Sequence, residues 1–181
     1  AGLPRVASRT KGGSYVDIVM QPVFVRFAPL GFFVYGGLIA VQSLWAGPWL
    51  TGVAGWSAPS AAAGLFAINL SMLFAFMGWG LAMPRLAARG IDASRLVRFG
   101  VPLALGLLAF NVLRPEPVGA GWWAAWCVAC TFVSPSQPAV GQAFPAPLAG
   151  RALSAFNLVI FAGVFSVQWG LGLGIDALQA V

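Results

Sequence analysis

The sequence predicts an all-α membrane protein, a polytopic bundle of five transmembrane helices. Three observations lead to this fold class. Only 8% of the 181 residues are charged and 60% are hydrophobic, whereas a soluble domain carries about a quarter charged residues. Five apolar stretches approach or reach the roughly 20 residues that a membrane-spanning helix needs. Arginines gather in the connectors on one side of these stretches, which is typical of the cytoplasmic side of a membrane protein.

The composition also narrows the class of function. The net charge of +6 comes from connectors beside apolar spans, a pattern that indicates topology signals and lipid-headgroup contacts rather than binding to nucleic acid. The chain has no His, so it lacks the commonest metal ligand and acid–base residue. Cys127 and Cys130 have the spacing of a redox dithiol, but no basic neighbour favours their thiolates. We therefore expect no enzyme, no cofactor and no metal site.

The expected order is a polar lead over residues 1–21 followed by a transmembrane domain over residues 22–181. The first span is expected to end at Gly47-Pro48 and the second at Pro84, and Asp92 or Ser94 would cap the third. The five spans are expected at about residues 23–46, 61–83, 94–113, 120–143 and 152–175.

Whether the fourth span crosses the bilayer decides on which side of the membrane each later segment lies. Its uninterrupted apolar part, Ala120 to Val133, has only 14 residues, which is too short to cross a bilayer. We therefore expect the helix to continue as a kinked helix through Pro135 and Pro138 to about Ala143. The alternative is a short buried helix followed by a Pro-rich loop, which would leave the bilayer uncrossed.

The basic residues fix the expected orientation. With five spans and a cytoplasmic N-terminus, nine of the ten fall on one side and only Arg114 falls outside. The chain would then lie in a plasma membrane, such as a bacterial inner membrane, with its C-terminus on the outer side. The nine are Arg5, Arg9, Lys11 and Arg26 near the start, Arg85, Arg89, Arg95 and Arg98 in the central connector, and Arg151.

The central connector resembles a signature of the major facilitator superfamily. The pattern Gly80-x-x-x-Pro84-Arg85-x-x-x-Arg89-Gly90 is similar to that family's Gly-x-x-x-Asp-Arg-x-Gly-Arg-Arg motif, with Pro84 in place of Asp. Two further stretches resemble bacterial members of the family. They are Arg26-Phe-Ala-Pro-Leu-Gly-Phe-Phe, which opens the first span, and Gly150-Arg151-Ala-Leu-Ser-Ala-Phe-Asn157, which opens the last.

The resemblance implies a secondary transporter of twelve helices in two six-helix bundles, working by alternating access. The five spans would match the first five helices of the second bundle, and residues 1–21 would belong to the loop between bundles. The chain would be a piece of a longer protein whose partners are the lipid bilayer, a small solute and the N-terminal half. Substrate, direction and coupling ion stay open; no Asp or Glu lies well inside a span, so a coupling carboxylate would lie on the other half.

Polar and aromatic residues at helical spacing are the candidates for lining the solute cavity. Amides in membrane helices also often bond a neighbouring helix, and that alternative stays open for each of them. Pro135 and Pro138 are candidates for a flexible inner gate, because they remove two backbone donors. The cavity candidates are Tyr35, Gln42, Trp45, Asn69, Thr131, Asn157 and Gln168.

Two other classes of function fit the same sequence. A small five-span membrane protein could serve as a scaffold or assembly subunit. The chain could also be a non-functional fragment of a transporter. The reading frame on both sides of this chain distinguishes these alternatives from a transporter half.

Overall fold

The computed structural model describes residues 14–180, and within this range every regular element is a helix. A short α1 (Tyr15–Val19) precedes the first long helix, Pro22–Val53, whose parts are α2 (Pro22–Leu30), α3 (Gly36–Ala40) and α4 (Ala46–Pro48) joined by π-helical turns. The other elements are α5 (Ala58–Ala88), α6 (Ala93–Leu113), α7 (Ala120–Cys130), α8 (Ser136–Ala143) and α9 (Ala146–Gln179). The all-α prediction is confirmed for the described residues.

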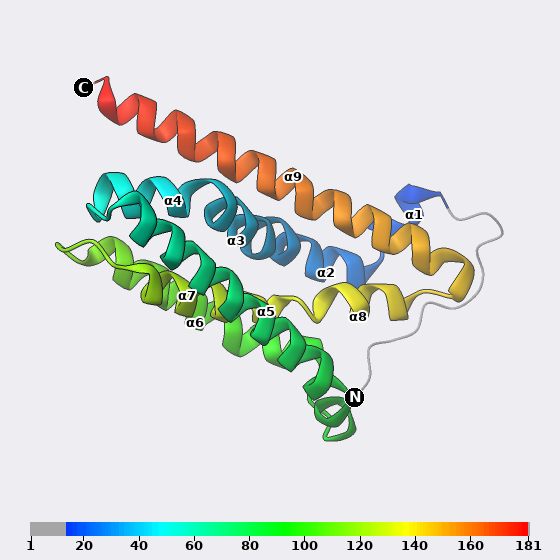
Figure 1. Cartoon of the computed structure of the whole chain (residues 1–181). Helices are drawn as coiled ribbons and strands as arrows, with labels where there is room; N and C mark the ends of the chain where they lie inside the picture. The colour runs from blue at the N-terminus through cyan, green and yellow to red at the C-terminus, as the bar shows by residue number, and fades with distance from the viewer. Residues whose placement is uncertain (1–13, 181) are drawn as a thin grey trace.

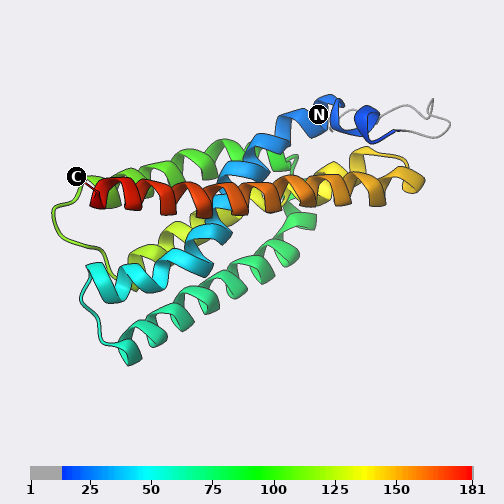
Figure 2. The ribbon, with the colours of Figure 1, turned by 90° about the horizontal axis from the view of Figure 1, so that it is seen from above.

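The helices run back and forth between two ends of an elongated bundle (Figures 1 and 2). At one end α2 and α6 begin, α5 ends and α8 meets α9; at the other end lie the connectors 54–57 and 114–119 and the end of α9. We name the first of these the arginine end. Among the described basic residues, only Arg114 lies at the opposite end, where it pairs with Glu116 at 3.8 Å. Arg26, Arg85, Arg89, Arg95, Arg98 and Arg151 lie toward the arginine end, whereas Arg5, Arg9 and Lys11 fall outside the described residues.

Four of these helices are long and apolar enough to cross a membrane: the first long helix, α5, α6 and α9. Little of their surface is covered by the rest of the chain. In the most apolar 18-residue stretch of α9, only 11% is buried. Large apolar side chains such as Leu158, Phe165 and Trp169 stand 64–71% exposed on α9. Contiguous apolar surface on this scale is foreign to a monomer in water, so the structure indicates a membrane-embedded helical protein.

The fourth predicted span is helical but interrupted. After α7 comes a 3-10 turn (Thr131–Val133), and α8 starts only after Ser134-Pro135. Taken together, α7 and α8 lead from the end with the 114–119 connector to the arginine end (Figure 1). The expected kink is present, because Pro135 and Pro138 lack the amide protons that a continuous helix needs here.

Several expected helix bounds are wrong. The first long helix does not end at Gly47-Pro48 but continues to Val53, and α5 passes through Pro84 to Ala88. A proline removes only one donor, so it did not stop either helix; around Pro48 the neighbouring turns are also widened to π-helical geometry. α9 begins at Ala146, directly after Pro145, and extends to Gln179, beyond the expected 152–175 on both sides.

Two apolar clusters hold the bundle together. One joins α1, α2, α8 and α9 around Phe24, Phe27 and Phe156; the other joins α5, α6 and α7 to the second half of the first long helix around Leu50, Ile68 and Trp126. Where the first long helix crosses α9, the backbones touch. A Cβ added to Gly36 would lie 2.9 Å from the carbonyl carbon of Gly163, so only glycine permits this approach.

Candidate functional site

Hydrogen bonds between amides and a serine link three of the long helices midway along the bundle. Gln42 Nε2 donates to Asn69 Oδ1 of α5 at 2.7 Å. Gln168 Nε2 of α9 donates to the hydroxyl of Ser43 at 3.2 Å. Because Gln42 and Ser43 are consecutive, the first long helix lies between α5 and α9 and holds both through polar contacts.

A second polar contact extends this feature along α9. Gln137 Nε2 of α8 donates to Asn157 Oδ1 at 3.5 Å. Asn157 and Gln168 are 11 residues apart, which is about three turns of an α-helix, so they share one face of α9. We name these six side chains the amide band: Gln42, Ser43, Asn69, Gln137, Asn157 and Gln168.

The amide band lies at the surface of the chain. Ser43, Asn69 and Asn157 are exposed, and the three glutamines are half-buried. Exposed amides in the middle of apolar helices are unfavourable against hydrocarbon, which offers them no hydrogen bonds. Each amide of the band bonds a neighbouring helix, as the alternative expected, and the polar atoms that stay exposed favour a polar neighbour, either water or another protein surface.

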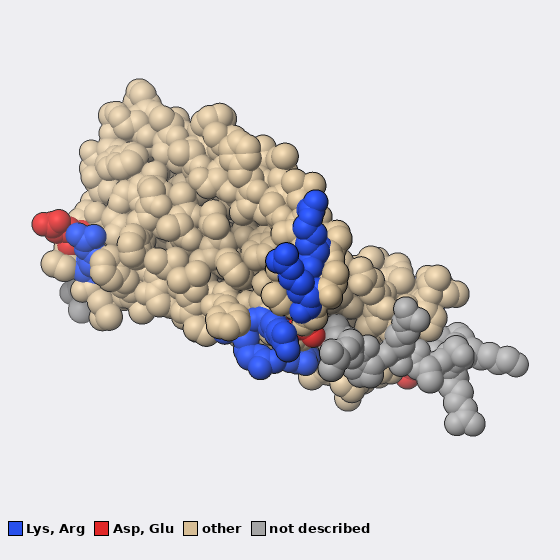
Figure 3. Space-filling model, turned by 90° about the horizontal axis from the view of Figure 1, so that it is seen from below, with Lys and Arg blue, Asp and Glu red and all other residues tan. Residues whose placement is uncertain are grey.

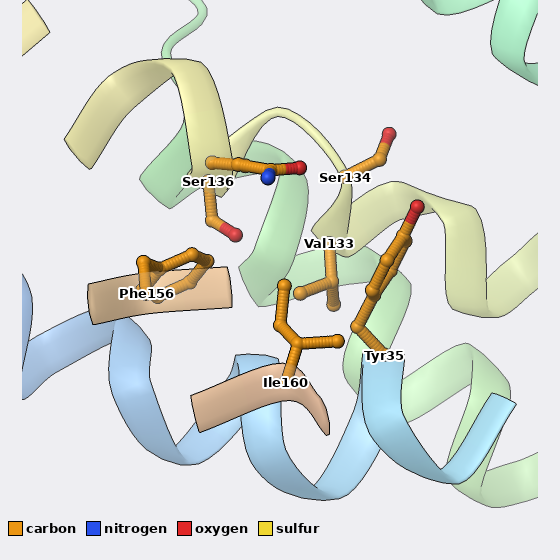
Figure 4. Close-up of a pocket in the computed structure, with 7 residues that line it drawn as sticks. Tyr35, Val133, Ser134, Ser136, Phe156 and Ile160 are labelled. Atoms are coloured by element: carbon orange, nitrogen blue, oxygen red, sulfur yellow. The ribbon is translucent and has the colours of Figure 1, made fainter. Parts of the chain in front are cut away.

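Tyr35 lies beside the same feature, at a shallow depression where the first long helix meets α9 and the break between α7 and α8. Val133, Ser134, Ser136, Gln137, Phe156 and Ile160 also line the depression, which leaves no room for a water molecule. In Figure 4 the hydroxyls of Tyr35 and Ser134 point away from the apolar floor made by Val133 and Ile160. An enclosed solute cavity is thus not formed at this place by the described residues alone.

The structure places the remaining two cavity candidates away from the band's hydrogen bonds. Thr131 is fully buried, where its hydroxyl accepts from Trp79 Nε1 of α5 at 2.9 Å and donates to the carbonyl of Val128 at 2.6 Å. Trp45 lies close to Gly172 of α9, and its buried Nε1 has no hydrogen-bond partner within the described residues.

Sequence reasoning missed the backbone feature that presents these residues. Two π-helical turns, Gly31–Tyr35 and Val41–Trp45, contain Tyr35, Gln42, Ser43 and Trp45. A π-turn inserts an extra residue per turn and rotates the side chains that follow it, and such turns are frequent at functional sites. Ser43 and Gln137 were also missed, although both are polar residues within or next to apolar stretches.

The residues that carry the family resemblance in the central connector and before the last span were expected to lie in cytoplasmic loops. This expectation is wrong for four of them. Gly80 and Arg85 lie inside α5, and Gly150 and Arg151 lie inside α9. α5 continues past Pro84, where it was predicted to end. α9 begins directly after Pro145, before its predicted start. Only Arg89 and Gly90 form the turn after α5.

That turn has a defined geometry. Gly90 adopts a φ of +74°, the amide of Ile91 donates to the carbonyl of Leu86 at 2.9 Å, and the amide of Gly90 donates to that of Ala87 at 2.9 Å. This is the Schellman arrangement that ends helices with glycine. Asp92 then caps α6 by accepting from the amide of Arg95 at 2.9 Å, so Asp92 rather than Ser94 is the cap.

Pro135 and Pro138 lie at a hollow at the arginine end. It has a volume of about 380 Å³, and the ends of α5, α6 and α8 contribute Met83, Asp92, Ala139 and Gln142 to its lining. Pro135 is buried and Pro138 exposed. The broken helix thus borders an open hollow at the arginine end.

Within residues 14–180 no group of three or more His, Cys, Asp or Glu could hold a metal ion. Cys127 and Cys130 are buried and not joined by a disulfide. Comparison with protein-family models, curated proteins and solved structures gives no match. Fold and site together indicate a membrane-embedded, all-helical protein whose long helices are joined by polar side chains.

Proposed function

We propose that this chain is part of the C-terminal half of a secondary transporter resembling the major facilitator superfamily, and that it helps to move a small solute by alternating access. The single observation on which this proposal rests is the amide band, a polar surface midway along otherwise apolar helices. The band faces outward from this half, where a second bundle would close a cavity over it. Amides and hydroxyls suit a solute bound by hydrogen bonds without a fixed countercharge.

The path of the chain supports the proposal. Five passages between the two ends, with the fourth made by α7 and α8, bring the six described basic residues of the arginine end to one side. That side is cytoplasmic by the rule that basic connectors face inward. The C-terminus then lies on the outer side of the plasma membrane.

Cysteine accessibility in the membrane tests the role of the band. Asn157→Cys and Leu158→Cys place thiols at nearly the same depth on α9, about 100° apart around the helix. In cells expressing the whole reading frame, with Cys127 and Cys130 replaced by alanine, a charged thiol reagent should modify the cysteine at 157 and not that at 158. Equal lack of reaction at both positions would contradict a water-filled cavity.

The reading frame around the chain gives an independent test. A second bundle of six spans encoded in frame before residue 1 supports the transporter proposal. Its absence favours the alternative of a small five-span membrane scaffold, and an interrupted frame favours a non-functional fragment.

The proline-containing break between α7 and α8 is our candidate for the inner gate. Its two missing backbone donors make this segment easier to bend than a continuous helix, and it borders the hollow at the arginine end. Replacing Pro135 and Pro138 by alanine in the full transporter should slow turnover more than it weakens solute binding. Unchanged turnover would reject the gate.

A further inference from the structure

A second polar site lies at the start of α6, away from the amide band. A hollow of about 260 Å³ is lined by Arg26 of α2, by Gly90 and Asp92 of the connector, and by Ser94, Arg95 and Arg98 of α6. Figure 3 shows Lys and Arg side chains gathered toward this end of the molecule, apart from the charged group at the other end.

The arginines at this hollow form no ion pair with the described residues. None of Arg26, Arg95 and Arg98 forms an ion pair there, and the recorded contact of Arg26 is with the ring of Phe27, 6.0 Å from its centroid. Arg95 and Arg98 are three residues apart, so they are neighbours on one face of α6. Three guanidinium groups face a single carboxylate, that of Asp92, which already caps the helix.

A buried hydroxyl at the same place lacks a partner. Ser94 is only 6% exposed, and its Oγ makes no hydrogen bond. Buried polar groups nearly always have a partner, and Ser94 lies in the first turn of a 21-residue helix, where free amides and the helix dipole favour an anion. The orphaned hydroxyl and the unpaired arginines therefore indicate the same missing group.

We infer that this hollow binds a phosphate-bearing anion, with Ser94 Oγ donating to a phosphate oxygen and the three arginines supplying charge-assisted hydrogen bonds. Guanidinium groups pair with phosphate in a fork geometry that suits this role. At the arginine end of a membrane protein the phosphate can belong to an anionic lipid headgroup or to a soluble phosphate. The inference does not depend on transport, because the site shares no residue with the amide band.

Retention of an anionic lipid by the protein tests whether the bound phosphate belongs to a lipid headgroup. The full chain is placed in nanodiscs of phosphatidylcholine with a minor fraction of phosphatidylglycerol, and native mass spectrometry measures how much phosphatidylglycerol stays bound. Replacing Arg95 and Arg98 by glutamine should lower the apparent affinity about tenfold or more, and Ser94→Ala several-fold. Arg114→Gln removes one arginine at the opposite end and should change nothing.

Titration with inorganic phosphate in pure phosphatidylcholine nanodiscs tests the second source, with chloride at equal ionic strength as the control. Binding of either probe that requires Ser94, Arg95 and Arg98 supports the site and identifies its ligand. Ser94→Ala should leave the ligand-free protein as stable as before, since the hydroxyl has no partner there, so loss of binding is separable from misfolding. Failure to bind both probes, an equal loss in Arg114→Gln, or unchanged binding in Ser94→Ala would overturn the inference.

Discussion

Replacing Gly163 by alanine should loosen the crossing between the first long helix and α9. A Cβ at this position would overlap the backbone carbonyl of Phe32. Backbone cannot rotate away as a side chain can, so the two helices must move apart. Gly170 lies on the same helix, and a Cβ there would meet nothing within 4 Å, which makes Gly170→Ala the matched control.

The expected magnitude follows from two opposing terms. Alanine in place of glycine stabilises a helix by about 0.5–1 kcal/mol at either position. At Gly163 the forced separation costs about 1–3 kcal/mol, as other overpacked positions do. Gly163→Ala should therefore be less stable than Gly170→Ala by about 1–3 kcal/mol.

Unfolding in mixtures of mild detergent and dodecyl sulfate, followed by tryptophan fluorescence, measures this difference. We expect Gly163→Ala to unfold at a lower dodecyl sulfate fraction than the original protein, and Gly170→Ala at the same or a higher fraction. Adding Gly36→Ala to Gly163→Ala should cost less than the sum of the two single changes, because the helices are already apart. If Gly163→Ala matched Gly170→Ala, the close backbone contact would be refuted.

Three further predictions concern single contacts. Gly90→Ala should lower the free energy of unfolding by about 1–2 kcal/mol, because the φ of Gly90 is +74°. Gly78→Ala, inside α5 with free space around it, should not lower it, and the same unfolding assay compares the two variants. Asp92→Ala should cost about 1 kcal/mol by removing the cap of α6, while Asp92→Asn should keep the cap and most of the stability. Thr131→Val should cost about 0.6–2 kcal/mol and shift the tryptophan emission, because it leaves the indole N–H of Trp79 without its acceptor; an unchanged stability and spectrum would contradict this contact.

How well each helix could be predicted depended on whether its ends carried local signals. α6 was predicted within one residue, because the cap at Asp92 precedes it and Arg114-Pro115 follows it. The first long helix was predicted to end too early, at Gly47-Pro48. The π-turn over Val41–Trp45 lies less than one turn before Pro48, and this wider turn depends on packing that no short sequence pattern encodes.

The same limit applies to the amide band. The sequence singled out Gln42, Asn69 and Gln168 as polar residues in apolar spans, but periodicity within one helix cannot say which neighbour each one meets. The pairing of Gln168 with Ser43 joins residues 125 positions apart in the chain. That contact exists because Gly36 and Gly163 bring α9 against the first long helix.

The positions of these contacts also constrain the motion that a transporter half would make. The first long helix is tied to α5 through Gln42 and to α9 through Ser43, and the glycine crossing keeps it against α9 along its middle. Sliding between these three helices would break both hydrogen bonds and the close glycine contact at once. Under the proposed transporter role, access to the amide band would change by movement of this half as a unit against a second bundle, with the local bending confined to the proline-containing break between α7 and α8.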